Sequence, residues 1–398
     1  MTCGPLSGQA QLAAVTDRST EGAPLSQELL ISPLGAVHEA AGAAFTDFAG
    51  WKMPVRYTSD LAEHAAVRES AGLFDLSHMG EIEVAGPAAG EALDRALAGK
   101  LSTLAVGRAK YSLLLAEDGG VLDDLIVYRL ADERFLVVAN ASNAEVVARE
   151  LLARADGPDS RVTDRSREYA LIAVQGPRSV DIVTRAVMGA DGTGLSIQDI
   201  TDMGYYRVLA GAYEGAELLV ARTGYTGEDG FELYTPVEHA ESLWNSLVEA
   251  GGDELVPCGL ACRDTLRLEA GMPLYGHELG ADLYPAQSGV GWVVALSSKG
   301  DFVGRSGVES ADMTGRPVLV GLAGEGRRAA RAGSTVKDAE GREVGVITSG
   351  VLSPTLGHPI AMALVDPACA ETGTALVADV RGKDLPMTVV DLPFYQRS

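Results

Sequence analysis

Cysteine and histidine are scarce in this sequence, and the shortage limits its chemistry. Only four cysteines occur in 398 residues, and the six histidines stand apart from one another. Cys258 and Cys262 lie four positions apart, but no second pair completes a set of zinc ligands. The sequence therefore predicts no metal site and no disulfide scaffold. It favours buried or incidental thiols in a reducing compartment, for which we expect the cytoplasm.

Long hydrophobic runs and an excess of positive charge are also missing. No apolar stretch approaches the ~18–20 residues of a membrane-spanning helix, and the first residues lack the charged start and apolar core of a signal peptide. With 32 basic against 55 acidic residues, the net charge is −23. A field of that sign repels nucleic acid and anionic membranes, so neither is expected as a partner. An anionic ligand would need a local cluster of arginines.

The common cofactor fingerprints are absent as well. No G-x-G-x-x-G follows a predicted strand, and no Walker A, H-E-x-x-H or G-x-S-x-G motif occurs. Hydride transfer, phosphoryl transfer and zinc-dependent hydrolysis are therefore disfavoured.

Helix and strand patterns divide the chain into three parts. Residues 1–33 are predicted to be a disordered N-terminal tail. Residues 34–298 alternate helical and strand patterns, as is typical of α+β subdomains with antiparallel sheets. In this part, SDLAEHAAVRESAG predicts a helix with Asp60 as its N-cap. After a boundary between residues 298 and 316, residues 316–395 show short β-rich stretches between glycine and proline turns, which predict a small β-barrel.

The segment GGVLDDLIVYRL places two carboxylates in an otherwise apolar strand. Side chains alternate between the faces of a strand, so Asp123 and Asp124 point to opposite sides, each among apolar neighbours. An unpaired buried carboxylate is costly, so at least one of them should meet a partner or a ligand. Alternatively, both follow a turn at the start of the strand and are solvated. The residue pattern leaves both interpretations open.

Two further segments supply polar groups that suit a ligand. RTGYTGEDGFELY is a Gly-rich turn leading into a strand, where Glu232 is either an exposed residue or a bidentate acceptor in a cleft. CGLACRDTLRLEAG predicts a helix with Arg263 and Arg267 one turn apart on the same face. These arginines either pair with acidic neighbours on the surface or clamp an anion, because the guanidinium matches carboxylate geometry.

Together with other segments, these stretches resemble the T-protein, or aminomethyltransferase, family of the glycine cleavage system. The resemblance covers residues 34–395. Each stretch alone is a modest signal, but their number, order and spacing make a strong one. The matching stretches are DFAGWKMPVRY, FDLSHMGE, GGVLDDLIVY, VVANAS, AVQGP, TGYTGEDGFELY, CGLACRDTLRLEAGMPLYGHE, VGWVV, FVGR and GVITSGVLSPTLG.

The resemblance implies a fold and a reaction. The family fold consists of interleaved α+β subdomains and a C-terminal β-barrel, arranged as a three-leaf ring around a central folate cavity. Its members take an aminomethyl group from the lipoyl arm of the H-protein, release ammonia and form 5,10-methylenetetrahydrofolate. We therefore expect tetrahydrofolate as the acceptor, the H-protein as the partner, and a role in glycine catabolism and one-carbon metabolism.

The resemblance also implies roles for individual residues. Asp123 matches the family's essential aspartate near the folate nitrogens, whereas Asp124 is expected to be structural. Glu232 matches the carboxylate that accepts paired N–H groups of the pterin ring, and Arg263 matches a folate-contacting arginine. The cavity lining is expected to include Tyr111, Tyr225, Met79 and Trp292.

Three alternatives belong to relatives of this family. Folate-linked demethylases carry a flavin domain ahead of a similar module, and no dinucleotide-binding segment precedes residue 34, so at most a demethylase half is expected. Folate-binding proteins of iron–sulfur assembly carry a K-G-C-[YF]-x-G-Q signature, where this chain has DLYPAQSGVGW. A folate-binding protein without turnover is disfavoured because Asp123, Glu232 and Arg263 are all retained.

Overall fold

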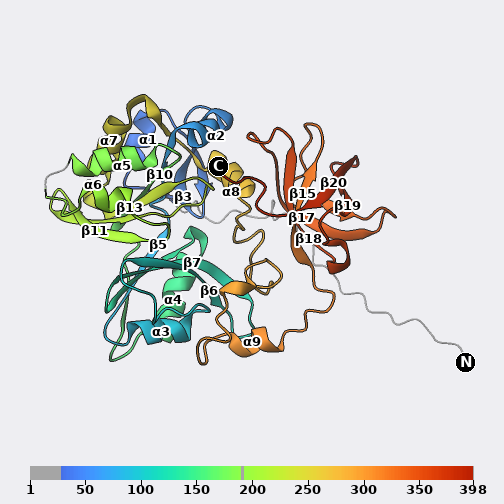
Figure 1. Ribbon diagram of the computed structural model, residues 1–398, viewed down its shortest axis with the longest axis horizontal. Helices are drawn as coiled ribbons and strands as arrows, with labels where there is room; N and C mark the ends of the chain where they lie inside the picture. The colour runs from blue at the N-terminus through green and yellow to red at the C-terminus, as the bar shows by residue number, and fades with distance from the viewer. Residues whose placement is uncertain (1–27, 190–191, 398) are drawn as a thin grey trace, which may run out of the picture.

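The chain leaves a six-stranded sheet after strand β4 (Ala71–Asp75) and returns to the same sheet at strand β10 (Tyr169–Gln175). Between these strands it builds a second sheet, and towards its C-terminus it closes a barrel, so the computed structural model has three lobes (Figure 1). The structure describes residues 28–189 and 192–397. The predicted α+β class with a C-terminal β-barrel is confirmed. Within the described ranges, no helix is long and apolar enough to cross a membrane.

The first lobe is organised around β10, in which all seven residues are buried. A strand that is apolar on both faces must be covered on both sides. Ile172 and Val174 pack on α5 (Ser179–Met188) and α7 (Ala240–Gly251), whereas Leu171 and Ala173 face the second lobe. The sheet order is β11 (Val208–Tyr213), β12 (Ala216–Ala221), β13 (Gly230–Pro236), β10, β4 and β14 (Leu255–Pro257).

Smaller elements complete this lobe. Helix α2 (Asp60–Glu69) begins after Ser59, whose hydroxyl accepts the amide of Ala62 at 3.2 Å, so the N-cap is Ser59 and not the predicted Asp60. Order also begins earlier than residue 34, because β1 (Leu30–Ile31) pairs with β3. The first 27 residues of the predicted tail lie outside the described residues. The other elements are α1 (Gly35–Ala40), β2 (Ala44–Phe48), β3 (Trp51–Arg56), α6 (Ile197–Thr201), η2 (Val237–His239), η3 (Gly252–Glu254) and α8 (Leu260–Glu269).

The second lobe is an antiparallel sheet with two helices on its outer face. Alternating residues of its long strand β7 (Val121–Ala131), Leu125 and Val127, pack on those helices. The opposite face of β7 carries Ile126 and Tyr128 against the first lobe. The sheet order is β6 (Arg108–Leu115), β7, β8 (Arg134–Ala139), β5 (Gly80–Ala85) and β9 (Arg161–Asp164); the helices are α3 (Ala89–Ala96) and α4 (Ala144–Ala155), with η1 (Ala141–Asn143) before α4.

A connecting segment with η4 (Gly291–Val293) and α9 (Arg305–Ser310) covers one edge of the second lobe and leads to the barrel. The barrel interior is filled by small and branched apolar side chains, as expected for a closed sheet of six short strands. The barrel order is β15 (Val318–Gly324), β18 (Pro359–Val365), β17 (Glu343–Leu352), β16 (Thr335–Lys337), β19 (Ala375–Asp379) and β20 (Asp384–Val390), with η5 (Pro367–Cys369) between β18 and β19.

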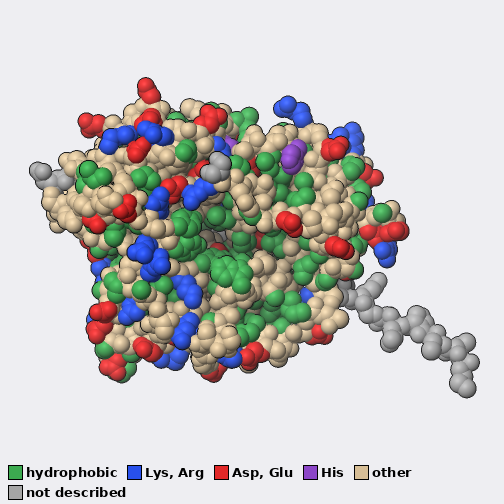
Figure 2. Space-filling view, in the orientation of Figure 1, with side chains coloured by type: hydrophobic (Ala, Val, Ile, Leu, Met, Phe, Trp, Pro, Cys, Tyr) green, Lys and Arg blue, Asp and Glu red, His purple; other side chains and the backbone are tan. Residues whose placement is uncertain are grey.

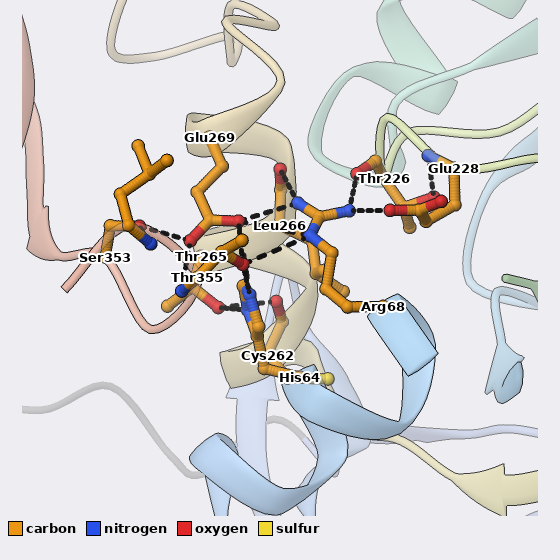
Figure 3. A network of polar contacts seen from close by, with 11 residues as sticks. His64, Arg68, Thr226, Glu228, Cys262, Thr265, Leu266, Glu269, Ser353 and Thr355 are labelled. Carbon is orange, nitrogen blue, oxygen red and sulfur yellow. Dashed lines mark hydrogen bonds and ion pairs between the residues drawn. The ribbon is translucent and has the colours of Figure 1, made fainter. Parts of the chain in front are cut away.

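A buried ionic network joins the barrel to the first lobe (Figure 3). Arg68 of α2 pairs with Glu228 at 2.9 Å and with Glu269, at the end of α8, at 2.7 Å. The Glu269 carboxylate also accepts hydrogen bonds from the Thr355 hydroxyl and amide of the barrel loop, at 2.8 and 3.0 Å. His64 lies 3.2 Å from the same carboxylate. Because these groups come from two lobes, the network fixes the barrel against α2 and α8.

Candidate active site

A cavity of about 460 Å³ lies where the three lobes meet. Figure 2 shows hydrophobic side chains gathered around a hollow at the centre of this face. The first lobe contributes Leu76, the second lobe Asp124 and the barrel Leu319, while Tyr275 comes from the connecting segment. Such a volume is in the range of small-molecule sites, and its walls are mostly apolar with a few convergent polar groups.

The two aspartates of β7 point to opposite sides of the sheet. Asp123 is fully buried. Its carboxylate accepts hydrogen bonds from the Asn140 amide (3.1 Å), the Asn140 side chain (2.9 Å) and the Asn143 side chain (2.6 Å). Asp124 lines the cavity, whereas Asp123 does not. Asp123 was expected at the ligand and Asp124 in a structural part, whereas the face of β7 that looks into the cavity is that of Asp124.

Asp124 is held by two neighbours. The Tyr111 hydroxyl donates to its Oδ2 at 3.0 Å, and the side-chain amide of Asn140 donates to its Oδ1 at 2.9 Å. Burial raises the pKa of Asp124 to about 6, although these hydrogen bonds oppose the rise. Burial and the neighbouring charge of Asp124 raise the pKa of Asp123 to about 7. A carboxyl group that titrates near neutral pH in a cavity is suited to proton transfer or to stabilising a cation.

Glu232 on β13 is also at the cavity, at the end of the Gly-rich turn. Its side chain lines the wall and the residue is only 7% exposed, so the exposed-strand interpretation is wrong. Its Oε2 accepts hydrogen bonds from the Thr223 hydroxyl at 2.5 Å and the Tyr128 hydroxyl at 3.3 Å. A carboxylate accepts bonds at both oxygens, so Glu232 can receive a donor from a bound molecule.

The two arginines of α8 have different environments. Arg263 lines the cavity, with its guanidinium 5.1 Å from the centre of the Tyr225 ring. Burial lowers the pKa of Arg263, while the charge of Glu232 opposes that effect. Arg267 is only 1% exposed and pairs with Glu278 at 2.9 Å and with Asp264 at 2.8 Å. Of the two arginines, therefore, only Arg263 suits an anion clamp. Arg267 instead pairs with acidic side chains, which was the alternative interpretation.

The four remaining residues predicted for the lining are all at the cavity. Tyr225 donates its hydroxyl to the Pro273 carbonyl at 2.5 Å, which ties the Gly-rich turn to the segment after α8. Tyr111 lies beside Trp292, with ring centroids 6.4 Å apart. Trp292 is 77% exposed, so it forms part of the rim rather than the floor. Met79 follows β4 in the first-lobe wall.

Several lining residues were not predicted. Tyr206 has a left-handed backbone conformation (φ 58), which is unusual for an aromatic residue and occurs where surrounding structure enforces it. The Tyr206 carbonyl accepts a hydrogen bond from the backbone amide of Ala109 at 2.9 Å, and the Tyr206 amide donates to the backbone carbonyl of Arg222 at 3.0 Å. Tyr206 therefore bridges the sheets of the first and second lobes at the cavity. No local sequence pattern distinguishes such residues. Other unpredicted lining residues include Asn140, Tyr234, Tyr275, Leu319 and Leu392.

Comparison with known proteins identifies the family. Residues 34–298 match the model described as GCVT N-terminal domain, and residues 318–396 match the model described as Glycine cleavage T-protein C-terminal barrel domain. The chain belongs to the glycine cleavage T-protein family.

T-protein relatives match the chain along most of its length. An aminomethyltransferase of Cutibacterium acnes is 62% identical over 367 residues, covering 92% of this chain and 98% of the relative. One from Streptomyces coelicolor is 54% identical over 378 residues, covering 94% and 99%. The crystal structure of glycine cleavage system aminomethyltransferase T from Bartonella henselae has a TM-score of 0.84 at 38% identity, covering 92% of this chain and 98% of that chain.

The expected T-protein identity and activity are thereby confirmed. The chain is an enzyme, an aminomethyltransferase of the glycine cleavage system. This activity decides against all three alternatives, which were a demethylase half, a folate-binding protein of iron–sulfur assembly and a folate-binding protein without turnover. The three lobes around a central cavity agree with the structural similarity to the T-protein of Bartonella henselae.

Proposed function

We propose that the cavity binds tetrahydrofolate as the acceptor of the one-carbon unit, with the pterin edge at Glu232. Paired N–H donors on a flat ring need a carboxylate acceptor and apolar walls, and the cavity offers both, with Leu76, Val138 and Leu171 beside Glu232. Among the described residues, Arg263 is the one arginine in the lining, and it suits a carboxylate or carbonyl of the same molecule.

Asp124, rather than Asp123, is proposed to act on the reacting atoms. The observation that supports this choice is its access to the same cavity as Glu232 and Arg263. As the carbon–sulfur bond of the aminomethyl group breaks, a cationic iminium species develops, and an ionised carboxylate beside it would stabilise the charge. With its pKa near 6, Asp124 is also able to exchange a proton with the folate nitrogen or the departing amine.

The lipoyl-bearing H-protein is proposed as the partner that delivers the aminomethyl group. Its arm would enter at the rim marked by Trp292, from which Tyr111 leads inward to Asp124. A departing thiolate needs no Lewis acid, so activity is expected to survive exhaustive chelation. The cytoplasm stays a prediction for the location.

The deciding experiment supplies aminomethyl-loaded H-protein and tetrahydrofolate and measures ammonia and 5,10-methylenetetrahydrofolate. Both products should form in equal amounts and only when all three components are present. Release of ammonia without formation of 5,10-methylenetetrahydrofolate would contradict tetrahydrofolate as the acceptor. Failure to bind tetrahydrofolate would reject the proposed acceptor.

A further inference from the structure

The two oxygens of Glu232 have unequal surroundings. Oε2 accepts hydrogen bonds from the hydroxyls of Thr223 (2.5 Å) and Tyr128 (3.3 Å). A carboxylate oxygen has about two lone-pair sites, so these donors fill Oε2. Within the described residues, Oε1 receives no hydrogen bond. The side chain therefore has one occupied oxygen and one open oxygen at the cavity wall.

The donors to Oε2 belong to a buried chain of hydroxyls. Tyr234 donates to the Tyr128 hydroxyl at 3.3 Å, and the Tyr128 and Thr223 hydroxyls lie 3.0 Å apart. All three residues are 1% exposed. Burial and the charge of Glu232 raise the pKa of Tyr128, and burial next to Tyr128 raises that of Tyr234. The phenols therefore keep their protons and remain hydrogen-bond donors. Tyr234 donates to Tyr128, and Tyr128 donates to Glu232.

Gln175, the last residue of β10, holds the backbone on which Thr223 stands. Its side-chain Nε2 donates to the Thr223 carbonyl at 3.1 Å, and its Oε1 accepts the Thr226 hydroxyl at 2.8 Å. A Cβ at Gly224 would lie 2.0 Å from Gln175 Oε1, and one at Gly230 would lie 2.3 Å from its Nε2. Both glycines are thus needed so that the turn can close around the amide. The stretches AVQGP and TGYTGEDGFELY fit one another at this point.

We propose that Thr223 and Tyr128 are positioning residues that occupy Oε2 of Glu232 and direct Oε1 at the ligand, and that Gln175 sets the position of Thr223. This inference rests on the proposed role of Glu232 in binding the pterin edge. With Oε2 filled, both N–H donors of the ligand converge on Oε1. The rotamer of Glu232 is already fixed, so little side-chain entropy is lost on binding. The arrangement also disfavours a ring that presents an acceptor at this position.

Thr223→Val tests the proposal because it removes the hydroxyl and keeps the shape. Tetrahydrofolate should bind roughly tenfold more weakly by calorimetry, in proportion to a lost charge-assisted hydrogen bond. KM for tetrahydrofolate should rise by a similar factor, with kcat at saturating folate changed far less, because Asp124 is untouched. Thr223→Ser should restore affinity. Gln175→Leu should shift KM in the same direction.

Thr235→Val is the matched control. Thr235 lies on the same strand as Glu232, is fully buried, and has a hydroxyl without a hydrogen-bond partner in the described part of the chain. Removing that hydroxyl should leave folate affinity unchanged. Equal losses in Thr223→Val and Thr235→Val would mean that both act through general stability and would overturn the positioning role.

Combining Thr223→Val with Glu232→Gln separates positioning from independent contact. If Thr223 acts through Glu232, the double variant should bind about as weakly as Glu232→Gln alone. Losses that multiply would overturn the proposal, and so would wild-type affinity in Thr223→Val. Failure of the unmodified chain to bind tetrahydrofolate would instead reject the proposed function itself.

Discussion

One peptide bond separates Asp123 from Asp124, yet their environments differ completely. Asp123 accepts three hydrogen bonds from Asn140 and Asn143 and ties β7 to the segment after β8. Asp124 shares Asn140 with it but opens into the cavity. The face of the strand therefore decides which carboxylate lies among the asparagines and which one lines the cavity.

Asp124→Asn should lower turnover by at least ~100-fold, because the amide neither carries charge nor exchanges a proton. Folate affinity should change far less. Asp123→Asn should keep most of its turnover, because the Asp123 side chain does not line the cavity. Steady-state kinetics and melting curves on both variants check this. Comparable losses of turnover in the two variants would show that the assignment to Asp124 is unsupported.

The raised pKa of Asp124 predicts a pH profile. If the ionised carboxylate is the active form, turnover should fall about tenfold per pH unit as pH decreases below ~6. The folded state binds this proton more tightly than the unfolded state, so ionised Asp124 costs stability above that pH. Asp124→Asn should therefore lack the acid limb of the profile and melt at a higher temperature at neutral pH. A profile unchanged by the substitution would assign the limb to another group.

Helix α8 shows how one element distributes charged residues among different tasks. Arg263 faces the cavity, Arg267 is paired with Glu278 in the interior, and Glu269 joins the network of Figure 3. Sequence spacing correctly put Arg263 and Arg267 one turn apart on the same face of the helix. Even so, two side chains one turn apart can meet different neighbouring segments. Helix α8 is therefore held at its C-terminal end by Arg267 and Glu269, while Arg263, one turn earlier, faces the cavity.

Glu269 makes the network sensitive to acid. Burial alone would raise the pKa of Glu269, but His64, Ser353 and Arg68 lower it from 4.5 to about 2. A depressed carboxyl pKa stabilises the fold above the ordinary value, and that contribution is lost as pH falls from about 4.5 towards 2.

Glu269→Gln should therefore destabilise the protein at neutral pH by roughly 3–5 kcal/mol, since Arg68 would be left buried with one acidic partner fewer. The dependence of unfolding free energy on pH in the acid range should become shallower. Denaturant titrations at several pH values measure both effects. As a comparison, Glu254→Gln removes an exposed carboxylate paired with Arg178 and should change stability far less than Glu269→Gln. Similar changes in the two variants would argue against the network as a joint between lobes.

At the scale of the whole molecule, the cavity exists only because three lobes meet. Leu76, Asp124 and Leu319 line it from the first lobe, the second lobe and the barrel, although they are far apart in sequence. A ligand in such a place contacts all three lobes and should stabilise their arrangement as well as each lobe.

Tetrahydrofolate should therefore raise the melting midpoint in a concentration-dependent way and saturate near one molecule per chain. At ~100 times the dissociation constant, mass action adds ~2.7 kcal/mol to the unfolding free energy. Thermal melts with increasing tetrahydrofolate give the measurement, and Glu232→Gln, which should bind at least tenfold more weakly, provides the control. A midpoint that does not move at any concentration would contradict the proposed folate site.

The sequence by itself determined the class of each segment and the family. The alternation in β7 and the glycine-punctuated end predicted a strand and a barrel because these patterns are local. The resemblance then supplied the activity and brought Glu232, Arg263, Tyr111, Tyr225, Met79 and Trp292 into consideration, and the structure brings all six to one cavity.

Only the tertiary structure decided between Asp123 and Asp124, and only it joined Gln175 to the Gly-rich turn. Alternation along a strand says that neighbours point to opposite sides, but not which side is covered by helices and which faces another lobe. That choice depends on packing between segments separated by many residues, such as β7 against the first lobe and Leu319 of the barrel against the same cavity. Such contacts arise from the way apolar faces are buried together, and no local pattern contains them.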